Sequence, residues 1–309
     1  MKRFIPTIIL VVVCIGAFWY ASSQSFFKKE DDASKPKPIV TVKQGDITGI
    51  KIKQGGVEMQ KKDGKWALTK PAAYPTNAYS GDSWTGAFVA LTQDSVIDEN
   101  PADLSKYGLS SPEQEFAATL ADGSSKTLQI GSPLPIAGHH YAKLKEAPAV
   151  FRVADDQIKG LQKDVVEFVD KSPFQMTYNE VSGVQMEWKG AAKTLQKVDV
   201  AKPSNESAWK LGDKELKGTD VEPILDKMLL MSSDQMVKAV SELKMDAPEL
   251  KLTLKSSKDG KETTSTYLGK VDGEQIWIAL QGGPWAFSVP VTSIQELFDK
   301  IKAPEAPAK

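Results

Sequence analysis

The pattern of apolar and polar residues predicts antiparallel strands in the first half of the chain. The two classes alternate in three closely spaced runs, residues 47–53, 57–61 and 65–68. This alternation is typical of strands with one buried face. The pairs Gly55-Gly56 and Asp63-Gly64 between the runs favour tight turns, so we expect a three-strand meander. Residues 116–130 alternate around Asp122-Gly123 and predict a further hairpin.

A helical period follows the meander. Apolar residues recur at the three- and four-residue spacing of one helix face at Trp84, Ala87, Phe88 and Leu91. We expect a helix that begins near Asn77 and covers the sheet with that face. Because tryptophans in such patterns are mostly core residues, Trp66 and Trp84 are predicted to be buried. Asp155 is placed to cap a closing helix that packs through Ile158 and Leu161.

The stretch from Tyr107 to Pro112 predicts a sharp change of chain direction. Gly108 permits a bend, and Pro112 blocks helix continuation, so residues 103–107 are expected to form one helical turn. After the hairpin, Gly131 to Gly138 is expected to be a proline-containing loop, followed by two strands at residues 140–144 and 150–153.

The pattern of the first half returns in the second half in the same order. Glu180 lies 134 residues after Asp46, and Pro248 lies 136 residues after Pro112. Small drifts in this separation are typical of surface-loop insertions in a duplicated unit. The second covering helix is expected to have Thr219 or Asp220 as its cap and one apolar face, formed by Val221, Ile224, Leu225, Met228 and Leu229.

The first residues of the chain predict a membrane segment. Residues 4–21 carry no charge and follow Lys2-Arg3, which matches a single transmembrane helix with a cytoplasmic N-terminus. One alternative is a signal peptide cleaved near the small residues Ala21-Ser22-Ser23. Another is a lipoprotein acylated at Cys14, which the bulky residue before that cysteine disfavours. Each alternative exports the rest of the chain.

These patterns predict an α+β fold, a tandem duplicated module of mainly antiparallel sheet with one covering helix in each copy. The expected segments are an anchor or signal at 1–23, a disordered linker at 24–40, a first repeat at 41–175, a second at 176–302 and a disordered tail at 303–309. The net charge of -1 gives no electrostatic case for binding nucleic acid. The one cysteine, Cys14, leaves no disulfide framework.

The sequence carries no positive signal for an enzyme. It has no Gly-x-Ser-x-Gly run, no Gly-rich phosphate loop and no metal-ligand spacing. The two histidines, His139 and His140, are adjacent, so on a strand they point to opposite faces and cannot readily share a metal. We therefore expect no enzyme activity, cofactor or metal. The candidate partner-binding residues are Tyr141, His140 and Trp285, which lie on strands or turns beside Gly- and Pro-rich loops.

A resemblance to a known family rests on several short motifs. These are Gly64-Lys65-Trp66, Leu104, Tyr107-Gly108-Leu109, Pro112, Leu128-Gln129-Ile130-Gly131, Tyr141 and Val150-Phe151. Together they resemble a bacterial domain-of-unknown-function family over most of residues 45–170, and more weakly over the second repeat. Lys244 and Met245 depart from the pattern there. The resemblance implies one N-terminal anchor and a gene often found beside gliding-type ABC transporter subunits. It supplies no catalytic residues.

Two functions are consistent with these expectations. The first is a membrane-tethered extracytoplasmic scaffold or binding module, accessory to an ABC-type transport system. The alternative is a protein that binds cell-wall glycan through exposed aromatic residues.

Overall fold

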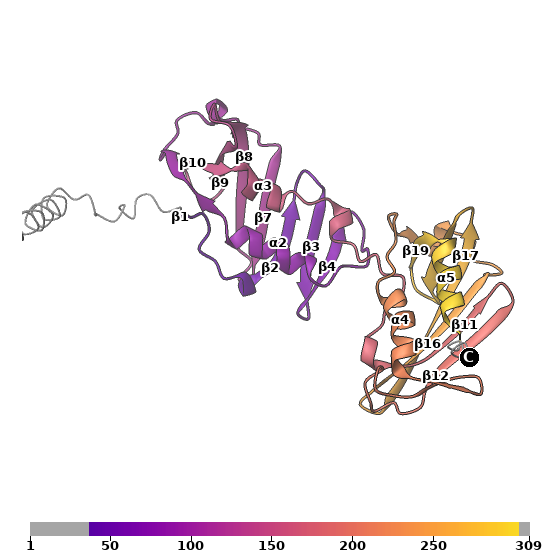
Figure 1. Ribbon diagram of the computed structural model, residues 1–309. Coiled ribbons are helices and arrows are strands. Elements are labelled where there is room, and N and C mark those ends of the chain that lie inside the picture. The colour runs from indigo at the N-terminus through magenta and orange to yellow at the C-terminus, as the bar shows by residue number, and fades with distance from the viewer. Residues whose placement is uncertain (1–36, 303–309) are drawn as a thin grey trace, which may run out of the picture. The chain divides into compact units, whose positions relative to one another are not determined.

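The computed structural model describes residues 37–302, which form two large sheets (Figure 1). The expected anchor, residues 24–36 of the expected linker and the C-terminal tail lie outside the described residues. Within residues 37–302, no helix has both the length and the apolar character needed to cross a membrane. The expected linker ends too late, because β1 (Lys37–Pro38) pairs with β5 (Thr92–Gln93), and Ile39 and Val40 are buried.

The first sheet contains eight strands in the order β4-β3-β2-β7-β8-β9-β10-β6. The strands are β2 (Ile47–Ile52), β3 (Val57–Lys62), β4 (Lys65–Lys70), β6 (Ser95–Asp98), β7 (Gln114–Leu120), β8 (Ser125–Pro133), β9 (His139–Leu144) and β10 (Val150–Ala154). Helices α2 (Ser80–Val89) and α3 (Asp155–Leu161) lie over one face (Figure 1). The meander β2-β3-β4 and the hairpin β7-β8 are antiparallel, which confirms both predictions.

The tryptophans of the first sheet fill its interior, as predicted. Trp66 is 6% exposed, and its indole N–H donates to Asp82 Oδ1 at 2.7 Å. Gly81 leaves room for that ring, since a Cβ there would overlap it. Trp84 is also buried. Helix α2 begins at Ser80 instead of near Asn77, whose side-chain oxygen accepts the Tyr79 N–H just before the helix.

The turn before the hairpin packs tightly on the sheet. Asp103 caps the short helix η3 (Leu104–Tyr107) by accepting the Ser105 N–H, and Gly108 follows with a φ of 68°. A Cβ on Gly131 would overlap the Tyr107 carbonyl oxygen. Gly131 lies at a bulge in β8, and this strand continues to Pro133, so the expected loop at residues 131–138 begins too early. The bulge and the two glycines let the turn approach the strand backbone.

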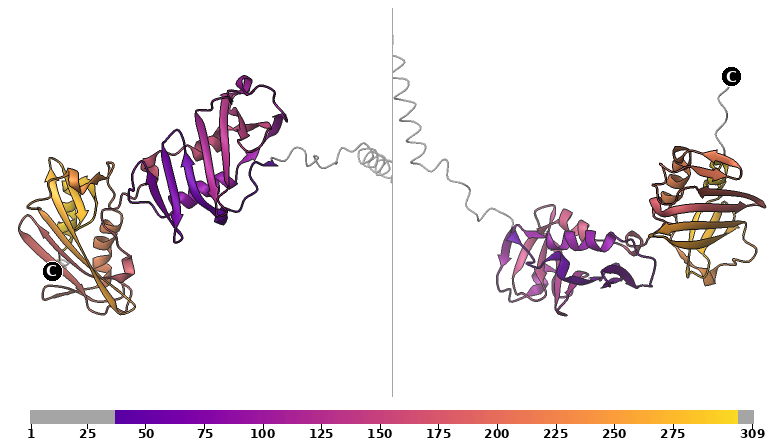
Figure 2. Two further views of the ribbon diagram at one scale, coloured as in Figure 1. Left: turned by 180° about the vertical axis from the view of Figure 1, so that it is seen from behind. Right: turned by 90° about the horizontal axis from the view of Figure 1, so that it is seen from below.

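The second sheet contains nine strands in the order β14-β13-β12-β11-β16-β17-β18-β19-β15. They are β11 (Val181–Trp188), β12 (Ala191–Lys197), β13 (Trp209–Leu211), β14 (Lys214–Leu216), β15 (Lys238–Ala239), β16 (Leu250–Lys258), β17 (Lys261–Asp272), β18 (Gln275–Leu280) and β19 (Trp285–Pro290). Helices α4 (Gly218–Leu229) and α5 (Val291–Lys300) contact each other and the core of this sheet (Figure 2). Each sheet therefore has two helices. In the first sheet these are the expected covering helix and the expected closing helix, α3, in which Ile158 and Leu161 are buried as predicted.

The core of the second sheet also contains a tryptophan. Trp209 is fully buried, and its indole N–H donates to the Ser204 carbonyl oxygen at 2.8 Å. The expected helix cap is wrong: α4 begins at Gly218, and Asp220 accepts the Lys217 N–H at 3.0 Å from within its first turn. The expected apolar face is confirmed except at Leu229, which is 42% exposed because the helix ends there.

The two sheets share one strand order. When β14 at the outer edge is left aside, β13-β12-β11-β16-β17-β18-β19-β15 has the same succession along the chain as β4-β3-β2-β7-β8-β9-β10-β6. In both, a helix separates the meander from the edge strand, a 3-10 turn follows that strand, and a helix closes the unit. The coarse prediction, an α+β fold of mainly antiparallel sheet, is confirmed.

Candidate functional site

The two histidines of β9 point to opposite faces of the first sheet. His140 pairs with the buried Val153 and lies on the face that α3 covers, where its Nδ1 is 2.7 Å from Asp155 Oδ1. His139 belongs to the other face, and its Nε2 lies 3.0 Å from Asp94 Oδ2. The pair therefore does not converge on one ligand. Within residues 37–302, no group of three or more His, Cys, Asp or Glu residues is placed to hold a metal ion.

His139 belongs to a charged cluster that ties the segment before β6 to the sheet. Arg152 Nε lies 3.3 Å from the same Asp94 carboxylate oxygen, and the Asp94 N–H donates to the Arg152 carbonyl oxygen at 3.1 Å. The Arg152 Nε is buried and makes no hydrogen bond in the described part of the chain. The Asp94 carboxylate thus lies beside both the His139 imidazole of β9 and the Arg152 guanidinium of β10.

Tyr141 is largely engaged by the η3 turn. Its ring contacts the Tyr107 ring edge-on, with 5.2 Å between the ring centroids. The Tyr107 hydroxyl donates to Asp98 Oδ2 at 2.9 Å, and this hydrogen bond raises the pKa of the Tyr107 phenol. Tyr141 therefore fastens a turn to the sheet, and only part of its ring faces solvent.

Trp285 belongs to the second sheet. It is the first residue of β19, pairs with Ala239 of β15 and is partly exposed. His140 and Tyr141 are neighbours on one strand with opposite side-chain directions. The three predicted residues thus do not form one site in either sheet.

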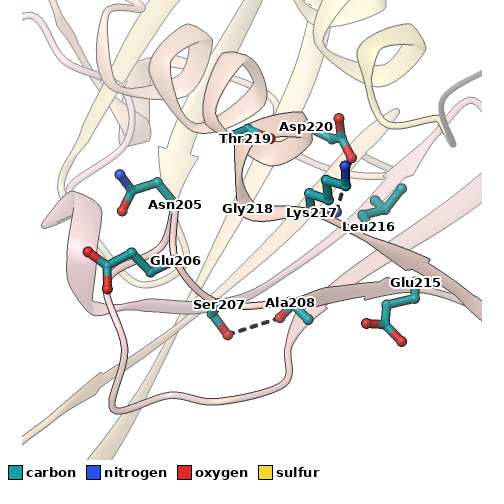
Figure 3. A pocket seen from close by; sticks show the side chains of 10 residues that line it. All are labelled: Asn205, Glu206, Ser207, Ala208, Glu215, Leu216, Lys217, Gly218, Thr219 and Asp220. Atoms are coloured by element: carbon teal, nitrogen blue, oxygen red, sulfur yellow. Dashed lines mark hydrogen bonds between the residues drawn. The ribbon is translucent and has the colours of Figure 1, made fainter.

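Several cavities lie elsewhere on the described surface. One of about 610 Å³ lies where α4 begins, and Figure 3 shows the side chains that line it. Its polar groups bond to each other: Ser207 Oγ donates to the Ala208 carbonyl oxygen, and Asp220 accepts the Lys217 N–H. Another, of about 560 Å³, lies beside the β16-β17 turn, where Lys258 pairs with Glu180 at 3.1 Å. In both cavities these polar groups are therefore already bonded to neighbouring residues of the wall.

A cavity of about 430 Å³ beside the β9-β10 turn differs from these two. Lys143 of β9 lines it, is only 7% exposed and donates to the Leu144 carbonyl oxygen at 2.9 Å. Sequence reasoning did not single out this lysine. In an alternating strand, a lysine between two apolar residues indicates the solvent face, so no local signal marks its burial.

The comparisons with known proteins give one match. Residues 66–238 match the model of a family described as a domain of unknown function, DUF4340. The chain belongs to this family. The match runs from β4 of the first sheet to β15 of the second, so it includes strands of both. It begins later than the expected resemblance at residues 45–170 and includes part of the second repeat, where a weaker resemblance was expected. No curated protein and no solved structure matches the chain.

Proposed function

We propose that this DUF4340 protein is a binding module, tethered outside the cytoplasm, that takes an extended segment of a partner protein on the β6 edge of its first sheet. The proposal rests on one observation, which is that this edge of the sheet is exposed. β6 is the last strand of the described sheet, and its Val96 and Ile97 are 44% and 42% exposed. An edge strand with exposed β-branched residues is a template for pairing with another chain.

Neighbouring residues favour one kind of partner. The Asp94 cluster precedes β6, the Tyr107–Asp98 bond closes its end, and both hold the strand in place before binding. Rigid edges bind with a smaller loss of conformational entropy. Glu99 is exposed directly after β6, so the partner strand is expected to carry apolar residues followed by a basic residue.

Site-specific photo-crosslinking in intact cells tests this function. A photoreactive benzophenone amino acid at position 97 is expected to give a covalent adduct with one envelope protein. The control position is Leu280, which is 39% exposed but lies on β18, an interior strand paired on both sides. Equal adducts at both positions, or none at position 97, would contradict the proposal.

The proposed location of the protein and the proposed identity of its partner are supported by the sequence. The uncharged run at residues 4–21 after Lys2-Arg3 supports a membrane tether with the described residues outside the cytoplasm. The family resemblance supports an ABC-type transporter as the partner system. Purification of the full chain from detergent-solubilised membranes is expected to recover transporter subunits. Recovery of other envelope proteins alone would remove the transporter from the proposal and keep the binding edge.

We further propose that the two sheets arose by duplication of one module. The shared strand order supports this, as do two details at matching positions. His139 of β9 meets Asp94, while Gln275 of β18 donates to Asp234 at 3.3 Å. The η3 turn packs on Tyr141, while Val240, Leu243 and Met245 pack against Trp277 of β18. An experimental structure in which the two units fail to superpose would end this part of the proposal.

Glycan binding is the second candidate, favoured by one observation. Tyr79 is 82% exposed and Trp285 is partly exposed, and sugars stack on such rings. A pull-down with purified cell-wall polymer separates the candidates. Retention of the chain that is lost in Trp285→Ala or Tyr79→Ala would favour glycan binding over the β6 edge.

A further inference from the structure

The cavity beside the β9-β10 turn has a cationic end and an apolar wall. It is bordered by the segment after β6, the η3 helix and the turn itself. The residues that line it are Asn100, Pro101, Leu104, Lys143, Lys145, Glu146, Ala147 and Pro148. Its volume of about 430 Å³ falls in the range of small-molecule sites.

The ammonium group of Lys143 has too few partners for its burial. Lys143 is 7% exposed, and in the described part of the chain its ammonium donates only to the Leu144 carbonyl oxygen, at 2.9 Å. An ammonium has three N–H donors, and a buried charge without a counterion is costly. No carboxylate of residues 37–302 forms an ion pair with it. The remaining donors are available to a ligand in the cavity.

The acid among the lining residues, Glu146, is already hydrogen-bonded. Both carboxylate oxygens of Glu146 lie 3.2 Å from the Thr127 backbone nitrogen and accept its N–H. Lys145 stands exposed at the rim, and its own backbone N–H donates to the Thr127 carbonyl oxygen at 2.8 Å. The cavity is therefore lined by two ammonium groups and the Asn100 amide. Its one lining acid, Glu146, is hydrogen-bonded to the Thr127 backbone. This favours an anion, and the nearby Glu146 carboxylate disfavours a dianion.

We propose that this cavity binds the carboxylate of a small organic acid, with its apolar body against Pro101, Leu104 and Pro148. The carboxylate accepts charge-assisted hydrogen bonds from Lys143 and Lys145, and the Asn100 amide donates a further one. The monoanion supplies the counterion that Lys143 lacks. The cavity lies next to the segment that follows β6, but this inference does not depend on the proposed function of the β6 edge.

Calorimetric titration of the full chain in detergent micelles with benzoate tests the proposal. Benzoate is expected to bind, and benzamide, its neutral analogue of equal shape, is expected to bind at least about tenfold more weakly, because it lacks the charge. Inorganic phosphate distinguishes general anion attraction from recognition of a carboxylate on an apolar body. Phosphate binding as tight as that of benzoate would overturn the proposal.

Variants identify the site. Lys143→Met keeps the length of the side-chain stem and is expected to weaken benzoate binding about tenfold or more. Position 145 is exposed, so Lys145→Met does not disturb the core. This variant is expected to weaken benzoate binding about threefold. Lys251→Met, an exposed lysine on β16, is the matched control and is expected to bind as wild type does. Wild-type affinity in the Lys145→Met and Lys143→Met variants would overturn the proposal. If Lys143→Met does not fold, the Lys145→Met result and the benzamide comparison decide.

Discussion

The backbone carbonyl oxygen of Tyr107 occupies the place that a Cβ on Gly131 would take, so a side chain at position 131 has no room. The two residues are parts of the motifs on which the family resemblance rests. Their contact gives the motifs a physical reason: Gly108 turns the backbone with a φ of 68°, and Leu109 then inserts into the interior at 2% exposure. Gly131 opens the bulge in β8 that receives the turn. The motif thus builds one tight joint between a turn and the sheet.

Gly131→Ala is therefore expected to destabilise the fold by about 2–4 kcal/mol, because the new methyl group displaces the η3 turn. Urea unfolding of the full chain in detergent measures the change. The matched control is Gly160→Ala in α3, where a Cβ would lie 4.0 Å from the Ala87 Cβ, an ordinary contact. Because alanine favours helix, this control is expected to be neutral or stabilising by up to about 1 kcal/mol. Equal effects of the two substitutions would refute the role of the joint.

Trp209→Phe is expected to lower the free energy of unfolding by about 2–4 kcal/mol. The smaller ring leaves a cavity at a fully buried position, and the Ser204 carbonyl oxygen loses its indole donor. Chemical denaturation followed by circular dichroism measures the loss. Tyr79→Phe serves as the control, since that ring is 82% exposed and its replacement is expected to change stability by less than about 0.5 kcal/mol. A Trp209→Phe variant as stable as this control would show that the indole is not part of the core.

Features encoded by neighbouring residues could be predicted from the sequence. Asp63-Gly64 and Asp122-Gly123 form the turns expected of them, with a positive φ at both glycines. Trp66 and Trp84 are buried as predicted, because alternation and helical period decide which face of an element is apolar. Leu229 fits the same period and is nevertheless exposed, because period alone does not locate the last turn of a helix.

Features that depend on distant segments could not be predicted. Lys143 is buried and lines a cavity together with residues 100–104 and the β9-β10 turn, and no local pattern indicates this environment. Asp94 meets His139 although they are 45 positions apart, and the meeting requires β6 to pair with β10. Tyr141 was a candidate for binding because it follows a Pro-rich loop, but the contact with Tyr107 occupies one side of its ring. Sequence periodicity predicts which face of a strand or helix is apolar, whereas these sites depend on which distant segments cover that face.

Asp94→Asn is expected to destabilise the fold by about 1–3 kcal/mol, a figure reduced for the quarter of the carboxylate that remains exposed. The substitution leaves Arg152 without its counterion and His139 without its carboxylate partner. Thermal and urea unfolding at neutral pH measure this loss of stability. Asp156→Asn is the control: its side chain is 95% exposed and pairs with Lys159 at 3.6 Å, so almost no change is expected. If the Asp94→Asn variant unfolds like this control, the Asp94 cluster does not hold β6 in place.

Tyr178 is expected to titrate well above an ordinary tyrosine. Burial, together with the negative charges of Asp226 and then Glu222, raises the pKa of its phenol to about 12. The unfolded chain loses this proton near pH 10, while the folded chain keeps it until about pH 12. The contribution to stability is therefore complete below pH 10 and is lost as the pH rises through the folded pKa. Ultraviolet absorbance of tyrosinate follows the titration, with Tyr178→Phe identifying this residue. Asp226→Asn removes one negative charge and is expected to lower the pKa of Tyr178, so an unchanged titration in that variant would contradict the electrostatic cause.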